Sequence, residues 1–234
     1  MQEWYRTGLE TARTRLENLG VIESRPANAT EELKQIINRH GSFKPVGGIS
    51  KVQELVARQA DVNVVGVDGK TALLIAVGDD DPLIERLLAQ FVGADINKNY
   101  GEGRTLVAIA AGDGKPALIP ILARYGANVN LPDDKGNTPL ILATRLADQD
   151  VAIQVVKELL KQGANIDAQN KNGETALFRA VQRKKHKLIQ FLLENGADPN
   201  SKNNQGLTPL ALAQANNDQA TINALTNRNL LKIP

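Results

Sequence analysis

The chain has 234 residues, of which 42% are hydrophobic and 23% are charged. This is an ordinary balance for a folded protein, and the length is sufficient to bury a substantial core. The formal net charge is only +2, and no apolar run approaches the length of a membrane span. We therefore expect neither a nucleic-acid partner nor a membrane partner.

Cysteine is absent from the chain, which excludes disulfides, zinc–thiolate sites and cysteine nucleophiles. The N-terminal stretch MQEWYRTGLETARTRLENLG lacks the apolar run of a signal peptide. The localisation is unknown: the chain is either cytoplasmic or exported (periplasmic or secreted). The absence of cysteine slightly favours export.

Three helical patterns precede residue 67. Within residues 1–29, apolar residues from Trp4 to Leu19 recur near helical spacing, which predicts a capping helix followed by a linker. Residues 30–66 contain TEELKQIINRH and ISKVQELVARQ, separated by the loop-like HGSFKPVGG. We interpret these two patterns as the paired helices of a degenerate first repeat.

Two short motifs then recur along the chain. The first reads GKTALLIA, GRTLVAIA, GNTPLILA, GETALFRA and GLTPLALA, and its threonines are spaced by 34, 33, 37 and 33 residues. The second reads QADVN, GADIN, GANVN, GANID and GADPN. Self-similarity at this period indicates stacked supersecondary units.

Each unit predicts a pair of helices. The threonine can cap a helix through its hydroxyl, and Pro139 and Pro209 follow it at the first helical position. A second helix, as in VVKELLKQG, ends at a glycine suited to the left-handed region. Gly69-Lys70-Thr71 looks like the end of a phosphate-binding loop, but Val64 occupies the position of the required second glycine. We therefore interpret Gly69 as a turn residue and Thr71 as a helix cap.

The two motifs resemble the ankyrin repeat, whose signature is T-P-L-H-x-A followed by G-A-D-x-N. The resemblance covers roughly residues 49–216. It implies an all-α solenoid of stacked helix pairs with β-turn fingers. On this basis residues 67–203 form four repeats and residues 204–234 form a C-terminal capping repeat. The family's histidine is replaced throughout, by Leu74, Ala108, Ile141, Phe178 and Ala211.

Three irregularities interrupt the repeat. Two extra residues before Gly93 predict a distorted helix end near Phe91 and Val92. Pro120 falls inside a short helix, which we expect it to bend or weaken. Four extra residues in TRLADQDVAIQVV predict a protruding loop at residues 147–150.

The sequence offers little for catalysis. Its two histidines, His40 and His186, are far apart, and the second lies in the lysine-rich run QRKKHK at 182–187. We interpret that run as a solvated inter-helix turn, or secondarily as an attraction for an acidic patch on a partner protein. GDDDP at 78–82 lacks the spacing of a calcium loop, and Asp81 is better explained as a helix cap. We expect no catalytic residue, no cofactor and no metal.

The resemblance implies a non-catalytic protein-binding module whose partner is another protein. One version is an inhibitor or immunity-like binder of a partner enzyme, and the alternative is a bacterial effector or scaffold that binds a host or cellular protein. A rival interpretation is an enzyme with its site in the N-terminal 45 residues, a segment too short for its own core. A nucleic-acid binder is disfavoured by the balanced charge. We expect a monomer.

Binding residues are predicted on the fingers and on the inner helices. The fifth residue of each stretch that begins with the motif's threonine points toward the inner surface in this interpretation, and the fingers carry apolar residues where turns are usually polar. The predicted set is Val65, Val67, Ile75, Tyr100, Ile109, Leu131, Leu142, Arg179 and Leu212. Tyr100 and Leu131 are the preferred anchors. The alternative is that the inner aliphatic residues pack against neighbouring repeats.

Overall fold

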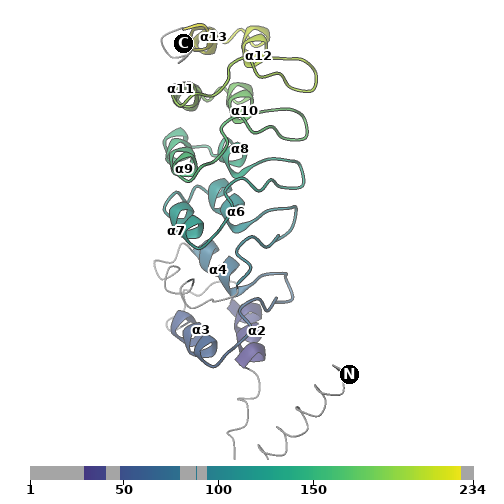
Figure 1. The fold of residues 1–234 in the computed structure, drawn as a ribbon, viewed down its shortest axis with the longest axis vertical. Coiled ribbons are helices and arrows are strands. Elements are labelled where there is room, and N and C mark those ends of the chain that lie inside the picture. The colour runs from purple at the N-terminus through teal and green to yellow at the C-terminus, as the bar shows by residue number, and fades with distance from the viewer. Residues whose placement is uncertain (1–28, 41–47, 80–87, 89–93, 228–234) are drawn as a thin grey trace, which may run out of the picture. The chain divides into compact units, whose positions relative to one another are not determined.

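The computed structural model describes residues 29–40, 48–79, 88 and 94–227 (Figure 1). The predicted N-terminal capping helix, the distorted end at Phe91 and Val92, and the Asp81 cap lie outside the described residues. The chain divides into two units, Met1–Ala94 and Asp95–Pro234. Each described element in both units is a helix, and no strand occurs within the described ranges, so the all-α prediction is confirmed.

Unit 1 contains α2 (Ala29–His40), α3 (Gly48–Ala57) and α4 (Ala72–Asp79). Helices α2 and α3 occur where the two N-terminal patterns predicted them. They pack through buried Leu33 and Leu55, and Arg58 on the α3 side reaches both carboxylate oxygens of Glu32 on α2, at 3.2 and 3.0 Å.

The Gly-Lys-Thr triplet of unit 1 is a turn and a helix start. Gly69 has φ of +79°, in the left-handed region, and Lys70 pairs with Asp68 at 2.8 Å. The buried Thr71 hydroxyl accepts a hydrogen bond from the Leu74 N–H at 3.2 Å. The interpretation of this triplet as turn and cap is confirmed.

The described residues of unit 2 form four helix pairs. The first helices are α6 (Leu106–Gly112), α8 (Pro139–Ala143), α10 (Ala176–Gln182) and α12 (Pro209–Ala215). The second helices are α7 (Leu118–Arg124), α9 (Gln149–Lys161), α11 (His186–Glu194) and α13 (Gln219–Thr226). The first helices form one column and the second helices another, with the connecting fingers projecting beside the first column (Figure 1).

The repeated threonine begins each first helix of unit 2. The hydroxyls of Thr105, Thr138, Thr175 and Thr208 each accept a hydrogen bond from the N–H three residues later. Each threonine thereby satisfies one of the backbone donors that a helix start leaves open. Pro139 occupies the first helical position after its cap, as the sequence predicts.

Backbone hydrogen bonds join each finger of unit 2 to the next. Asp134 N–H donates to the Glu102 carbonyl at 2.9 Å, and Lys171 N–H donates to the Lys135 carbonyl at 3.1 Å. The approach is close enough that a Cβ atom on Gly136 would lie 2.6 Å from the Lys171 nitrogen. The glycine of the first motif is therefore required for contact between fingers as well as for its positive φ.

A second set of bonds joins the repeats of unit 2 where the second helices end. Asn97 Oδ1 accepts from Asn128 N–H at 2.8 Å, while its amide donates to the Gly126 carbonyl at 3.2 Å. Asn130 repeats this arrangement one unit later, with Asn165 N–H and the Gly163 carbonyl. Each of these side chains therefore donates one hydrogen bond to the next repeat and accepts another from it.

Two predicted irregularities of unit 2 differ from the structure. The loop predicted at residues 147–150 is correct only in its first half: residues 147 and 148 form an exposed connection, whereas residues 149 and 150 belong to α9, which is 13 residues long and is capped by the Asp148 carboxylate through the N–H groups of Asp150 and Val151. Lys185 also donates to the Ala147 carbonyl at 2.8 Å. Pro120 lies at the third position of α7, within the first turn, where a missing N–H is tolerated.

Candidate protein-binding surface

The predicted binding residues are distributed over both units. In unit 1, Val65 is half-buried, Val67 is 86% exposed and Ile75 is only 3% exposed. In unit 2, Leu142 is 3% exposed, and the remaining members are half-buried: Tyr100, Ile109, Leu131, Arg179 and Leu212.

The expectation that Ile75 and Leu142 lie on the surface is therefore wrong. Leu142 belongs to α8, a five-residue helix of which every residue is buried. Helix α8 packs against α6, α9 and α10, which leaves little of it accessible to solvent. At these two positions the side chains are buried, as expected from the alternative interpretation that the inner aliphatic residues pack against neighbouring repeats.

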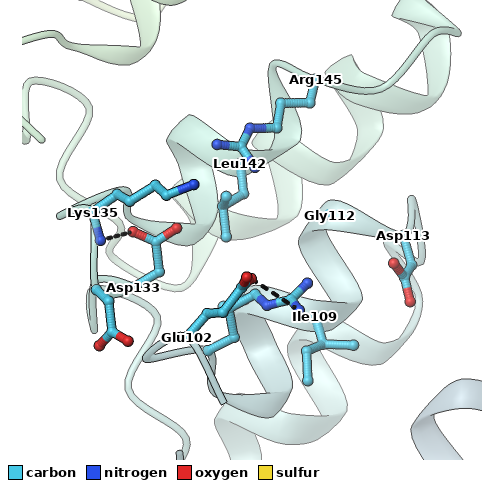
Figure 2. Close-up of a pocket in the computed structure, with 11 residues that line it drawn as sticks. Glu102, Ile109, Gly112, Asp113, Asp133, Lys135, Leu142 and Arg145 are labelled. Carbon is cyan, nitrogen blue, oxygen red and sulfur yellow. Dashed lines mark hydrogen bonds and ion pairs between the residues drawn. The ribbon is translucent and has the colours of Figure 1, made fainter. Parts of the chain in front are cut away.

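Unit 2 carries two adjoining hollows between its fingers and its first helices. The first, of about 340 Å³, is lined by Ile109 and Asp113 of the α6 repeat and by Leu142 of α8. Figure 2 shows Leu142 between Lys135 and Arg145, with Glu102 and Ile109 across the hollow. The second hollow, of about 480 Å³, extends to the α10 repeat. Three residues line both hollows: Asp134, Lys135 and Arg145.

A buried hydrogen-bond network supports the floor of the hollows. The Asp133 carboxylate is 9% exposed and accepts from the N–H groups of Lys135 and Asn137, at 2.9 and 2.7 Å. The Asn137 amide also donates to this carboxylate, and its oxygen accepts from the Asn170 amide at 3.0 Å. The network thus crosses from one finger to the next.

The same network positions Arg179. The Asn170 amide donates to Glu174 Oε2 at 3.0 Å, and the Arg179 guanidinium reaches the same oxygen at 3.2 Å. Gln182 holds a guanidinium nitrogen of Arg179 at 2.6 Å. Arg179, a predicted binding residue, therefore stands in a fixed orientation at the edge of the second hollow.

The second hollow carries an excess of positive charge. Glu174 forms an ion pair with Arg179, whereas Arg145 and Lys171 have no carboxylate partner among the described residues. Burial lowers the pKa of Arg183, and the nearby Arg179 and Arg145 charges lower it further against the opposing effect of Glu174. These guanidinium groups therefore share a region where their repulsion is only partly compensated.

The charges that line the first hollow are more nearly balanced. Glu102 is neutralised by Arg104 at 3.3 Å, and Asp133 is enclosed by its hydrogen bonds. Asp113 and Asp134 are exposed and have no cationic partner within the described ranges. Lys135 and Arg145 line this hollow too, so the charge of the surface changes along the stack from nearly balanced beside α6 to basic beside α10.

Among the described residues, neither His186 nor the acidic side chains form a second candidate site. His186 is exposed at the start of α11 and contacts Asp218 at 3.0 Å, which suits a surface histidine. In the part of the chain that the structure describes, no cluster of His, Asp or Glu side chains could hold a metal ion. No described helix combines the length and apolar character needed to cross a membrane.

Comparison with known proteins agrees with this geometry. A family model of ankyrin repeats in three copies matches residues 78–154 and 145–232. The chain belongs to the ankyrin repeat family. Ankyrin repeats are typically non-catalytic and imply a protein-binding module with a protein partner.

Several curated ankyrin proteins are similar over part of the chain. SH3 and multiple ankyrin repeat domains protein 2 of Homo sapiens is 41% identical over 86 residues, which are 36% of this chain and 4% of that protein. An ankyrin repeat protein of Acanthamoeba polyphaga mimivirus is 36% identical over 90 residues, or 38% of this chain and 12% of its own length. An ankyrin repeat-containing protein of Treponema pallidum is 37% identical over 94 residues, 40% of this chain and 30% of that protein. The chain thus spans less than a third of each of these relatives.

Sequence reasoning missed the residues that give the ankyrin groove its charge. Arg145 stands seven residues after its threonine, where other repeats have Gly78, Gly112 and Ala215. Arg183 stands eight residues after Thr175, where an earlier repeat has Asp113. Comparing charge at repeat-equivalent positions was the signal that could have found them, because it reveals substitutions confined to neighbouring repeats.

Proposed function

We propose that this chain binds its partner protein through the groove of unit 2, defined by the two hollows together with the adjacent fingers. The observation that carries the proposal is the pair of adjoining hollows, which present exposed, unpaired charges above a hydrogen-bonded floor. A fixed, open surface of this type suits an extended protein contact better than a small substrate, which is usually enclosed. Tyr100 and Leu131 remain the proposed apolar anchors.

We further propose that binding holds a partner enzyme inactive. A pre-organised surface loses little conformational entropy on binding, so it can occupy a partner's functional face firmly. No chemistry on this chain is needed for such an effect. Adding the purified chain to the isolated partner should lower the partner's activity in proportion to the fraction bound. Full activity of the saturated complex would leave binding in place and refute the inhibitor role.

The binding surface can be tested by affinity capture from a lysate of the native source. We expect Tyr100→Ala combined with Leu131→Asp to weaken capture of the partner by more than about 2 kcal/mol, the scale of hot-spot truncations. The matched control is Tyr125→Ala with Leu160→Asp, which changes a half-buried tyrosine and a half-buried leucine in the other helix column. Circular dichroism would establish that both variants fold. Equal capture by the first variant and the unmodified chain would place the partner elsewhere.

A further inference from the structure

The groove of unit 2 holds a cluster of positive charges, two of which, Arg145 and Lys171, have no carboxylate partner among the described residues. We call Arg145, Lys171, Arg179 and Arg183 the basic cluster. Arg145, Lys171 and Arg179 line one hollow, and Arg183 lies near enough to Arg145 and Arg179 to be affected by their charges. Two acidic residues line the same hollow: Asp134, and Glu174, whose carboxylate already accepts hydrogen bonds from Asn170 and Arg179.

Maintaining such a cluster without a ligand is unfavourable. Like charges in a partly buried region repel one another, and water screens them less than it does on an open surface. An approaching carboxylate would relieve this repulsion and could accept two parallel hydrogen bonds from one guanidinium. Arg145 is exposed and has no competing carboxylate among the described residues, so it is available for this contact.

The surroundings favour a peptide over a nucleic acid. Single-stranded nucleic acids need aromatic side chains on which bases stack, and no aromatic residue is found among the described residues lining either hollow. Asn172, also in the second hollow, is an exposed amide that can bond to a peptide backbone. The hollows adjoin across three successive repeats, which matches an extended chain better than a compact ligand.

We propose that the basic cluster binds an extended acidic segment of the partner protein, with Asp or Glu carboxylates paired to its guanidinium groups. This inference rests on the proposed function and adds the chemistry of the bound segment. Since Asp113 lines only the first hollow, and Lys171 and Arg179 line only the second, the acidic part of the segment lies beside α10 and not beside α6.

The first test uses a short fluorescein-labelled oligoglutamate peptide and the full chain. Fluorescence anisotropy should show binding that weakens as salt is added, as expected for ion pairs at a groove. Arg145→Gln with Lys171→Gln should weaken binding by about tenfold or more, because it removes two of the unpaired charges. The matched control is Lys157→Gln, which removes one exposed, unpaired positive charge from α9, outside the hollows, and should change affinity by less than about twofold.

Three results would overturn the inference. The peptide could fail to bind, Lys157→Gln could weaken it as much as Arg145→Gln alone, or a single-stranded oligodeoxythymidylate of equal length could bind as tightly. The last outcome would indicate general attraction for polyanions.

A second measurement separates this inference from the proposed function. Arg145→Gln with Lys171→Gln should also reduce capture of the native partner, whereas Lys157→Gln should not. If the Tyr100 and Leu131 variant loses the partner but the basic-cluster variant keeps it, the groove binds the partner without an acidic segment, and only this inference falls. If neither variant affects capture, both proposals fail together.

Discussion

The internal repeats of unit 2 and its terminal repeat share a sequence motif but differ in what surrounds it. Gly136 and Gly206 have φ values of +79° and +78° and precede equivalent threonine caps. A Cβ on Gly136 would meet the next finger, whereas a Cβ on Gly206 would have no atom within 4 Å. Helix α10 buries five residues, while α12 buries only Pro209 and Ala213. The same local conformation therefore occurs at Gly206 without the neighbouring finger that packs against Gly136.

This comparison separates two reasons for keeping a glycine. The positive φ is a local requirement, and it applies to internal and terminal repeats alike. The close approach of the next finger is a requirement of stacking, and it applies only where a next finger exists. Both requirements are met by glycine, so the sequence does not distinguish them. Substitutions are needed to separate the effect of the positive φ from the effect of finger stacking.

The largest expected effect comes from Gly136→Ala. The new methyl group would lie 2.6 Å from the backbone nitrogen of Lys171, which cannot move without breaking its bond to the Lys135 carbonyl. We expect a loss of about 3 kcal/mol or more, from overpacking added to left-handed strain. Gly206→Ala carries only the strain and should cost about 1–2 kcal/mol. Urea denaturation monitored by circular dichroism would compare them, and equal losses would show that finger stacking adds nothing at Gly136.

A smaller effect concerns the contact between α11 and the terminal helix α13. Asp218 caps α13 by accepting from Thr221 N–H at 3.2 Å, and it also faces His186. Burial raises the pKa of Asp218, but the hydrogen bonds from Thr221 and the contact with His186 outweigh it, so the net pKa is lowered. A lowered carboxyl pKa contributes stability that is complete above its unfolded value, near pH 4, and is lost as pH falls through the folded value.

Asp218→Asn keeps a capping oxygen and removes the charge. At neutral pH we expect this variant to be less stable by under about 1 kcal/mol, since the His186 side chain that faces Asp218 is half exposed to solvent. The difference should disappear below the folded pKa of Asp218, where the native carboxyl is protonated. The control is Asp148→Asn, which changes the cap of internal helix α9. Thermal melts between neutral and strongly acidic pH would test this, and a difference that persists in acid would mean that the charge is not responsible.

The features that the sequence predicts correctly are those fixed by adjacent residues, and most of the features that it misses depend on the neighbouring repeats. The helix pairs, the threonine caps and the left-handed Gly163 depend on a few adjacent residues, so the sequence predicted them correctly. The loop prediction at residues 147–150 fails only for residues 149 and 150, because extra residues can equally extend a helix and the Asp148 cap starts α9 at Gln149.

The candidate site was less predictable because it depends on contacts between repeats. Leu142 was expected at the surface, but the packing of α6, α9 and α10 around a five-residue helix encloses it. Arg179 was selected for its position, yet its orientation comes from Glu174 and ultimately from Asn170 in the finger. Side chains whose surroundings come from the next repeat cannot be placed by reading one repeat at a time.

An effect of opposite sign, a stabilisation, is expected at the last interface between repeats. Asn97 and Asn130 each accept one bond and donate another to the next repeat, but Asp167 stands at the equivalent place and only accepts, from Asp198 N–H at 2.9 Å. A carboxylate has no N–H to donate, so the link to the terminal repeat lacks its second bond. Asp167→Asn supplies a donor for the Gly196 carbonyl, the counterpart of the carbonyls that Asn97 and Asn130 reach.

We expect Asp167→Asn to stabilise the chain by about 0.5–1.5 kcal/mol, the net value of one hydrogen bond. The reverse change, Asn130→Asp at an internal interface, should destabilise by a similar amount. Asp198→Asn serves as the control, since it removes the same charge nearby while keeping the acceptor for Asn200 N–H. Urea denaturation would measure all three variants. If Asp198→Asn stabilises as much as Asp167→Asn, relief of repulsion between the two aspartates explains the gain, and the terminal interface differs from the internal ones in charge and not in its missing hydrogen bond.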